Sequence, residues 1–255
     1  MFSNEDHPDF PKVPDEAVLW RYMDLSRFLS LLEDEALHFA RSDYMSDRWE
    51  GAFGHVNIAE RPRLYGEHYS KMFPTLSVAF KNMKRRIYLN CWYESGCESA
   101  AMWGLYQADG RGIAVRTTWG DLKASITSSL DIFGGRVKYV DYTTTFIPEN
   151  SMFAPFMHKR QSFTHEQELR LVYWLDANTG PNETGEVGSG GDHIPWDAPT
   201  EFGHKVSVDL DRLVGSIYVA PEAPAWFAEL MSSLVKRYGH DWHVQHSDLS
   251  SDPVW

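Results

Sequence analysis

The chain reads Glu166-Gln167-Glu168-Leu169-Arg170-Leu171-Val172-Tyr173-Trp174 at the point where a charged block meets a run of apolar and aromatic residues. This composition predicts a β-strand over residues 168–174. Elsewhere, short strand patterns mix irregularly with short helical patterns, and no βαβ period repeats. We therefore predict an α+β fold built from short strands and helices.

Hydrophobic periodicity and residue propensities predict the other elements in the same way. They predict strands at 18–23, 37–40, 87–92, 112–118, 136–142, 205–210, 216–219 and 242–246. They predict helices after a cap at Asp24 or Ser26, then over 67–84 with a break at Pro74, and over 99–107, 122–130 and 224–238. We expect the polar and aromatic loop at 42–50 to carry function, as exposed loops between regular elements often do.

The domain organisation predicted from these patterns is simple. Residues 1–17, with three prolines and several acids, form an N-terminal arm, and residues 18–255 form one α+β domain. Residues 176–204 are a polar insertion with several glycines, which we interpret as a surface loop. Its glycine-rich part precedes no helix start, so it does not match a phosphate-binding loop.

The overall charge limits the class of partner. The 255 residues carry a net charge of −12, so we expect no broad, sequence-independent binding to a nucleic-acid backbone, which needs basic surface. The one notable basic cluster is Lys81, Lys84, Arg85 and Arg86, which we interpret as a solvated helix end rather than a phosphate site. The 10 Trp residues must largely line a core, a pocket or an interface.

The cysteine and histidine patterns predict neither a disulfide scaffold nor a metal site. Cys91 and Cys97 are too few for a disulfide framework, which favours a reduced, cytoplasmic setting. His240, His243 and His246 recur every third residue, a spacing that alternates between the two faces of a strand. No apolar run approaches the roughly 18 residues that span a bilayer, so we expect no membrane association.

Two carboxylates are the strongest candidates for chemistry. At a strand start, Glu166 and Glu168 would share a face because side chains alternate with a period of two, and Arg170 would continue along that face. Two carboxylates at one site can divide labour, one stabilising positive charge and the other positioning or deprotonating an acceptor. The alternative is a solvated strand edge with paired charges.

Arg21 and a nearby aromatic helix face are the candidates for ligand binding. Arg21 lies between Trp20 and Tyr22, where an unpaired charge is costly, so it either meets a carboxylate (Asp47, Glu50 or Glu168) or binds an anionic ligand. Trp103 and Tyr106 are three residues apart on a predicted helix. They are either core residues or a wall on which a planar ring stacks.

Taken together, these blocks resemble the domain of unknown function 2971 family of mostly bacterial proteins. The matching segments are 19–22, 46–51, 90–92, 98–103 with Tyr106, 159–160, Phe163, 165–170, 206–210 and 217–221. The resemblance runs from about residue 18 to the C-terminus. Each segment alone is weak evidence for the resemblance, whereas the occurrence of all of them in the same order is more specific.

A looser similarity links the chain to the ADP-ribosyltransferase fold, through a first strand with Arg21 and a late E-x-E at Glu166 and Glu168. This resemblance implies NAD as co-substrate and Arg21 as the residue that contacts it. We add Tyr22, Trp103 and Tyr106 as cofactor-binding candidates, because such an enzyme needs an aromatic wall such as Trp103 or Tyr106 in the same cleft as Arg21. The resemblance also implies Glu168 as the catalytic carboxylate and Glu166 as the acceptor-side residue. The family's Ser-Thr-Ser-like element is replaced here by 91–93, and Ser95 and Ser99 are the nearby hydroxyls.

Two functions follow as hypotheses. The first is an ADP-ribosyltransferase-like enzyme that modifies a protein or nucleic-acid acceptor, in the manner of a toxin or antiphage effector. The second is a non-catalytic module or sensor that uses the same pocket to hold a nucleotide or a protein partner. A nuclease is disfavoured because the sequence lacks a clustered metal-binding carboxylate motif.

Overall fold

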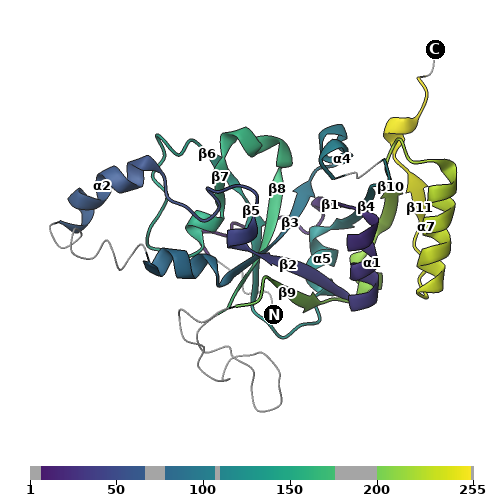
Figure 1. Cartoon of the computed structure of the whole chain (residues 1–255), viewed down its shortest axis with the longest axis horizontal. Helices are drawn as coiled ribbons and strands as arrows, with labels where there is room; N and C mark the ends of the chain where they lie inside the picture. Colours follow the sequence, from purple (N-terminus) through teal and green to yellow (C-terminus); the bar gives the residue numbers. More distant parts are fainter. Residues whose placement is uncertain (1–6, 67–77, 107–109, 176–199, 254–255) are drawn as a thin grey trace.

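A nine-stranded sheet organises the molecule, with helices around it and a separate two-stranded sheet (Figure 1). The computed structural model describes residues 7–66, 78–106, 110–175 and 200–253. The large sheet takes strands from both the beginning and the end of the chain, and helices and strands are mixed along the sequence. The predicted α+β class is confirmed.

The bounds of the elements are as follows. The strands are β1 (Val18–Met23), β2 (Ala36–Arg41), β3 (Ile87–Glu94), β4 (Ile113–Thr118), β5 (Ile132–Arg136), β6 (Lys138–Val140), β7 (His158–Arg160), β8 (Glu168–Trp174), β9 (Gly203–Ser207), β10 (Ser216–Val219) and β11 (Val244–His246). The α-helices are α1 (Leu25–Asp34), α2 (His55–Tyr65), α4 (Ala100–Tyr106), α5 (Trp119–Ser125), α6 (Leu210–Leu213) and α7 (Ala225–Arg237). Short 3-10 helices are η1 (Ser42–Tyr44), η2 (Ala154–Phe156), η3 (Gln161–Glu166) and η4 (Asp248–Ser250).

The sheet divides at β3. One edge of β3 pairs with β8 along almost its whole length, from Ile87 opposite Trp174 to Tyr93 opposite Glu168. The other edge is shared, because β2 pairs with it only near its start and β1 only near its end. Among the described strands, none pairs with residues 90–92 on that edge, and β1 and β2 separate there into a fork.

Each branch of the fork continues into its own part of the sheet. On one side β1 pairs with β4, which pairs with β10 and then β11. On the other side β2 pairs with β9. In Figure 1, α7 lies beside β11 at one end of the molecule and α2 projects from the opposite end.

Local chemistry explains where α1 begins and which face it buries. Asp24, one of the two residues predicted to cap this helix, is the cap. Its Oδ1 accepts a hydrogen bond of 2.8 Å from the Arg27 backbone N–H. Phe28, Leu31 and Leu32 then face the core with helical spacing. This packing places the buried face of α1 in the main hydrophobic core.

Some predicted boundaries need correction. Of the predicted strand at 136–142, only β6 (Lys138–Val140) forms as expected; Arg136 is the last residue of β5, which begins earlier, at Ile132. β5 contains Gly134 and Gly135, which lower the strand propensity of its sequence. A Cβ atom on Gly135 would lie 3.2 Å from Phe10 Cα, so the glycine permits this close packing. The predicted helix at 122–130 instead begins at Trp119, where Thr118 caps it, and ends at Ser125.

Several predicted segments lie partly outside the described residues. The predicted helix at 67–84 is described only from residue 78, and residues 78–84 are helical. Most of the predicted loop at 176–204 lies outside the description, and its last residues belong to β9, which begins at Gly203. Within the predicted N-terminal arm, Phe10 and Val13 are buried.

Among the helices in the described ranges, none combines the length and apolar character that crossing a membrane demands.

Candidate functional site

A cavity of about 650 Å³ opens at the fork between β1 and β2. This volume lies within the roughly 300–1,000 Å³ typical of small-molecule sites. The predicted site residues that line it are Arg21, Tyr22, Tyr106, Glu166 and Glu168. Residues far apart in the sequence are thus brought together where the sheet opens.

Arg21 follows Trp20, the last β1 residue paired with β3, and its side chain reaches the unpaired edge of β3. Its Nη1 donates a 2.9 Å hydrogen bond to the Cys91 carbonyl, and its guanidinium carbon lies 5.6 Å from the Trp92 ring centre. Burial lowers the pKa of Arg21 from its ordinary value, yet an Arg side chain remains cationic in proteins. Arg21 is therefore a half-buried positive charge facing the cavity.

The carboxylates considered as partners for Arg21 are engaged elsewhere. Asp47 Oδ1 lies 2.7 Å from Nη2 of Arg160, and Glu50 Oε1 lies 2.5 Å from Nη1 of Arg170. Among the described residues, Arg21 forms no ion pair with any carboxylate. Of the two alternatives left open by the sequence, the predicted salt bridge is therefore not formed.

Glu166 and Glu168 reach the same place, although not for the predicted reason. Glu166 is the last residue of η3, not the first of a strand, and Gln167 turns the chain with a left-handed φ of 36°. Glu168 then begins β8, a strand paired on both sides by β3 and β5, and is 4% exposed. The alternative of a solvated strand edge therefore does not describe Glu168.

One lysine joins the two carboxylates. Lys159 Nζ lies 3.1 Å from Glu168 Oε2 and also donates to Glu166 Oε2. Arg170 Nε donates a 2.6 Å hydrogen bond to Glu168 Oε1. Glu50, Arg170, Glu168, Lys159 and Glu166 thus form a continuous chain of alternating charges leading from the core to the cavity.

This arrangement sets the charge state of the site. Burial alone would raise the pKa of Glu168, but Arg170 and Lys159 outweigh it and lower that pKa to about 2. Burial opposes the charge on Lys159, whereas Glu168 and Glu166 raise the pKa of its amine above the usual range. At neutral pH Glu168 is thus a carboxylate and Lys159 an ammonium group.

The aromatic residues divide between the cavity and the core. Tyr106 is 38% exposed and lines the cavity, and burial raises the pKa of its hydroxyl, with Cys91 and Glu166 adding to the effect. Trp103 is only 1% exposed and does not line the cavity. It packs edge-on against Tyr22, with ring centres 4.9 Å apart, and its Nε1 donates to Glu98. Of the two residues predicted for an aromatic wall, Tyr106 lines the cavity and Trp103 lies in the core.

Cys91 lies in the cavity next to the carboxylates without becoming a nucleophile. Burial raises the pKa of its thiol, and the Glu168 carboxylate raises it further. The thiol is therefore protonated at neutral pH, whereas nucleophilic attack requires a thiolate.

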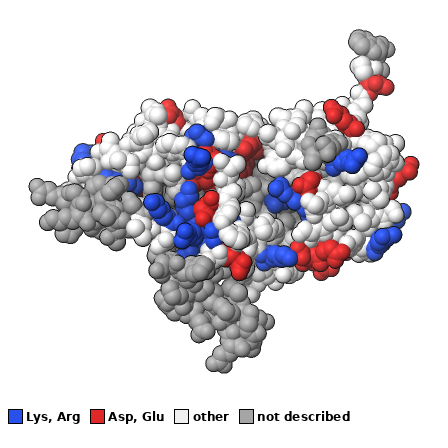
Figure 2. Space-filling model, viewed as in Figure 1, with Lys and Arg blue, Asp and Glu red and all other residues white. Residues whose placement is uncertain are grey.

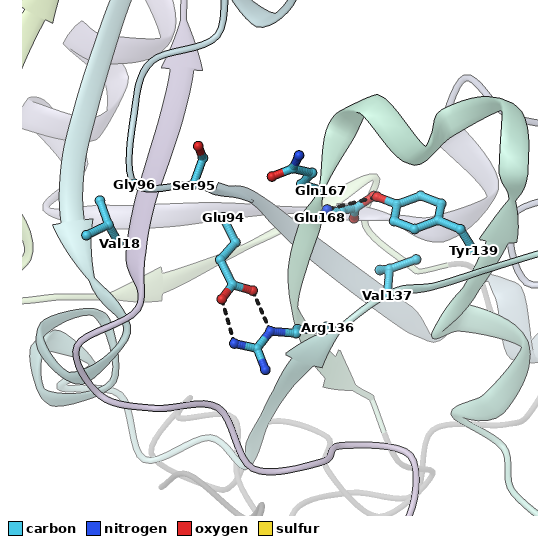
Figure 3. Close-up of a pocket in the computed structure, with 9 residues that line it drawn as sticks. All are labelled: Val18, Glu94, Ser95, Gly96, Arg136, Val137, Tyr139, Gln167 and Glu168. Carbon is cyan, nitrogen blue, oxygen red and sulfur yellow. Dashed lines mark hydrogen bonds and ion pairs between the residues drawn. The ribbon is translucent and has the colours of Figure 1, made fainter.

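A smaller cavity of about 440 Å³ lies beside the main one and shares Glu168 with it (Figure 3). The Glu94 carboxylate and the Arg136 guanidinium face each other there through two hydrogen bonds of 2.6 Å. Glu168 N donates a 2.8 Å hydrogen bond to the Tyr139 hydroxyl, which fixes the start of β8. Ser95, one of the two hydroxyls noted in the sequence, lines this smaller cavity and not the main one.

Lys159 belongs to the site, although the sequence patterns predict no role for it. Its direct neighbours His158 and Arg160 are polar, so the local sequence carries no signal that Lys159 is buried. A buried lysine must be paired, and only the fold shows with which groups. The partners of Lys159 could not be predicted, because the turn at Gln167 is what brings Glu166 and Glu168 to it.

Within the ranges that the structure describes, no three His, Cys, Asp or Glu side chains are grouped so that they would hold a metal ion. The site is thus built from one isolated cation, two carboxylates held by a lysine, and tyrosine rings. These groups suit a ligand that carries anionic, hydroxyl and planar parts together.

Comparisons with known proteins add little to this geometry. No family model matches the chain, and no curated protein matches it either. A structure of DarT from Thermus sp. 2.9, in complex with ADP-ribosylated single-stranded DNA, aligns with 95% of this chain and 100% of its own length. The aligned residues are 9% identical and the TM-score is 0.41, a likeness too loose to support a conclusion about function.

Proposed function

We propose that the cavity at the fork binds NAD and that the protein is an ADP-ribosyltransferase-like enzyme acting on a macromolecular acceptor. The observation that supports this proposal is that Arg21, Tyr106, Glu166 and Glu168 line one cavity although they come from separate parts of the chain. Arg21 precedes Glu166 and Glu168 in the chain, as the resemblance to the transferase fold implies.

Each group has a part of the dinucleotide to recognise. Within the described ranges, Arg21 donates to a carbonyl and pairs with no carboxylate, so its positive charge suits a pyrophosphate. Tyr106 offers a partly exposed ring against which a planar base packs. Glu168 and Glu166 are the acceptors available for ribose hydroxyl groups.

The proposed reaction replaces one bond at the ribose C1′ atom. The bond between C1′ and the nicotinamide nitrogen breaks, its electron pair stays with nicotinamide, and positive charge develops on the ribose. Ionised Glu168 would stabilise this charge. An acceptor oxygen or nitrogen then forms the new bond to C1′ and releases its proton, for which Glu166 is the nearby base.

Nicotinamide release from purified protein with NAD tests this proposal. We expect release by the wild type, at least about a hundredfold less by Glu168→Gln, and a smaller loss with Glu166→Gln. Glu229→Gln, on the exposed side of α7, is the matched control and should behave as the wild type. Equal release by wild type and Glu168→Gln would refute the catalytic assignment.

One observation favours the alternative of a non-catalytic nucleotide-binding module. Both carboxylate oxygens of Glu168 already accept hydrogen bonds, from Arg170 and from Lys159. Glu168 must therefore give up one of these hydrogen bonds before it can accept one from a ribose hydroxyl group. Calorimetry separates the two functions, because a binding module would bind NAD, with loss of affinity in Arg21→Ala, and release no nicotinamide.

A further inference from the structure

Two exposed aromatic rings lie together at the rim of the main cavity. Tyr44 is 58% exposed and Phe202 is 65% exposed, with ring centres 4.9 Å apart. Tyr44 also lines the cavity. We call this pair the aromatic platform. Large apolar rings exposed side by side, next to a cavity, are typical of a binding surface.

A buried arginine holds the platform in place. The guanidinium carbon of Arg41 lies 4.9 Å from the Tyr44 ring centre and 5.4 Å from that of Phe202. Arg41 is itself fixed by Asp43, at 2.7 Å, and by the Thr200 carbonyl, at 2.5 Å. The rings are thus ordered before any ligand arrives, which reduces the entropic cost of binding.

A basic helix end is attached to the same two segments. Ser42 Oγ donates to the Lys84 carbonyl, and Thr200 Oγ1 donates to the Arg85 carbonyl, both at 2.7 Å. Ser42 and Thr200 are each two residues from a platform ring. The backbone of Lys84 and Arg85 is therefore attached to the segments that carry the rings. Figure 2 shows Lys and Arg side chains, with Asp and Glu among them, left of centre on the face that it draws.

The charges of this helix end are available to a ligand. In the described part of the chain, Lys81, Lys84 and Arg85 form no ion pair. Of the nearby acids, Asp43 is paired with Arg41, which leaves the exposed Glu201 as a single carboxylate against these three cations. The surface is locally basic although the whole chain carries a net charge of −12.

We propose that the aromatic platform and the Lys81–Lys84–Arg85 cluster bind single-stranded nucleic acid and present it at the mouth of the cavity. Aromatic rings stack any unpaired base, and neighbouring cations contact the backbone phosphates. The acidic remainder of the surface confines the contact to this short stretch. The role of the strand as acceptor rests on the proposed transferase function, whereas its binding does not.

Fluorescence anisotropy of a labelled 12-residue oligothymidylate with the full chain, in the absence of NAD, tests binding directly. We expect Tyr44→Ala/Phe202→Ala to weaken binding at least about tenfold, because each base–ring contact is lost. Lys84→Glu/Arg85→Glu should weaken it further and lower the dependence on salt by about 0.7 in log–log slope for each phosphate contact removed. Trp226→Ala and Lys236→Glu/Arg237→Glu, an exposed ring and exposed cations on α7, are the matched controls and should bind as the wild type.

Three results would overturn this inference. The first is no binding by the wild type at about 50 mM salt, where such contacts are strongest. The second is an equal loss in the α7 controls. The third is displacement of the oligonucleotide by an oligoglutamate peptide at equal concentration, which would make the surface a site for acidic peptides. Because the assay contains no NAD, its outcome is separate from that of the nicotinamide-release experiment.

Discussion

Lys159 Nζ lies 3.1 Å from Glu168 Oε2 and simultaneously donates to Glu166, so a single ammonium group holds both carboxylates of the cavity. Lys159 and Glu168 are 7% and 4% exposed at their side chains, so neither charge is well solvated. The lysine therefore stabilises two like charges that would otherwise repel each other. In the proposed reaction it is a positioning residue for both.

Replacing Lys159 with Met should destabilise the fold. The change leaves two carboxylates facing each other at the cavity wall without their shared cation, and breaking a buried pair in this way costs about 3–5 kcal/mol. Urea unfolding measures the loss. Lys205→Met is the control, because Lys205 and Asp34 form an ion pair with 60% exposure at the lysine, and it should cost less than about 1 kcal/mol. Equal costs for the two variants would contradict the buried role of Lys159.

Arg21→Ala should weaken NAD binding while leaving the fold largely stable. Arg21 has a backbone carbonyl partner and no ion-paired carboxylate in the described structure, so its removal strands no negative charge. Losing a charged contact to a phosphate should reduce the affinity by at least about tenfold. Calorimetric titration of NAD measures this change, with Arg63→Ala, a 77% exposed arginine on α2, as the control. Unchanged affinity in Arg21→Ala would remove Arg21 from the proposed site.

The strands that position the site could be predicted from sequence because their patterns are local. β1 and β8 begin and end at the predicted residues, since runs such as 168–174 favour a strand whatever their neighbours are. The helix α2 was not predicted, because Pro62 lies inside it and its apolar residues do not follow a clear helical period.

The partners within the site could not be predicted in this way. Glu166 and Glu168 converge because of the left-handed turn at Gln167, not because they share a strand. Arg21 has no carboxylate partner among the described residues because β1 separates from β3 after Trp20. That separation is set by the pairing of the whole sheet and not by the sequence of β1. Long-range pairing of this kind has no local signal in a single sequence.

The stability contributed by Glu168 should depend on pH in a defined window. Its pKa is about 2 in the folded protein, below the ordinary value of about 4.3 for Glu. A depressed folded pKa means that the contribution is complete above about pH 4.3 and is lost as the pH falls through about 2. Urea unfolding of the wild type and of Glu168→Gln at about pH 7, 4 and 2.5 should therefore show a difference that shrinks only in the acidic range. A difference that is constant down to about pH 2.5 would contradict the coupling of Glu168 to Arg170 and Lys159.

Tyr106 and Trp103 should separate binding from stability, because they lie on the same short helix but face different surroundings. Trp103→Ala should cost about 3–5 kcal/mol of unfolding free energy, since the ring is buried and packs against Tyr22. Tyr106→Ala removes a ring that is 38% exposed at the cavity, so it should cost less stability and should weaken NAD binding instead. Urea unfolding and calorimetry on both variants check the two effects together. If Tyr106→Ala binds NAD as the wild type does, the exposed ring is not part of the dinucleotide site.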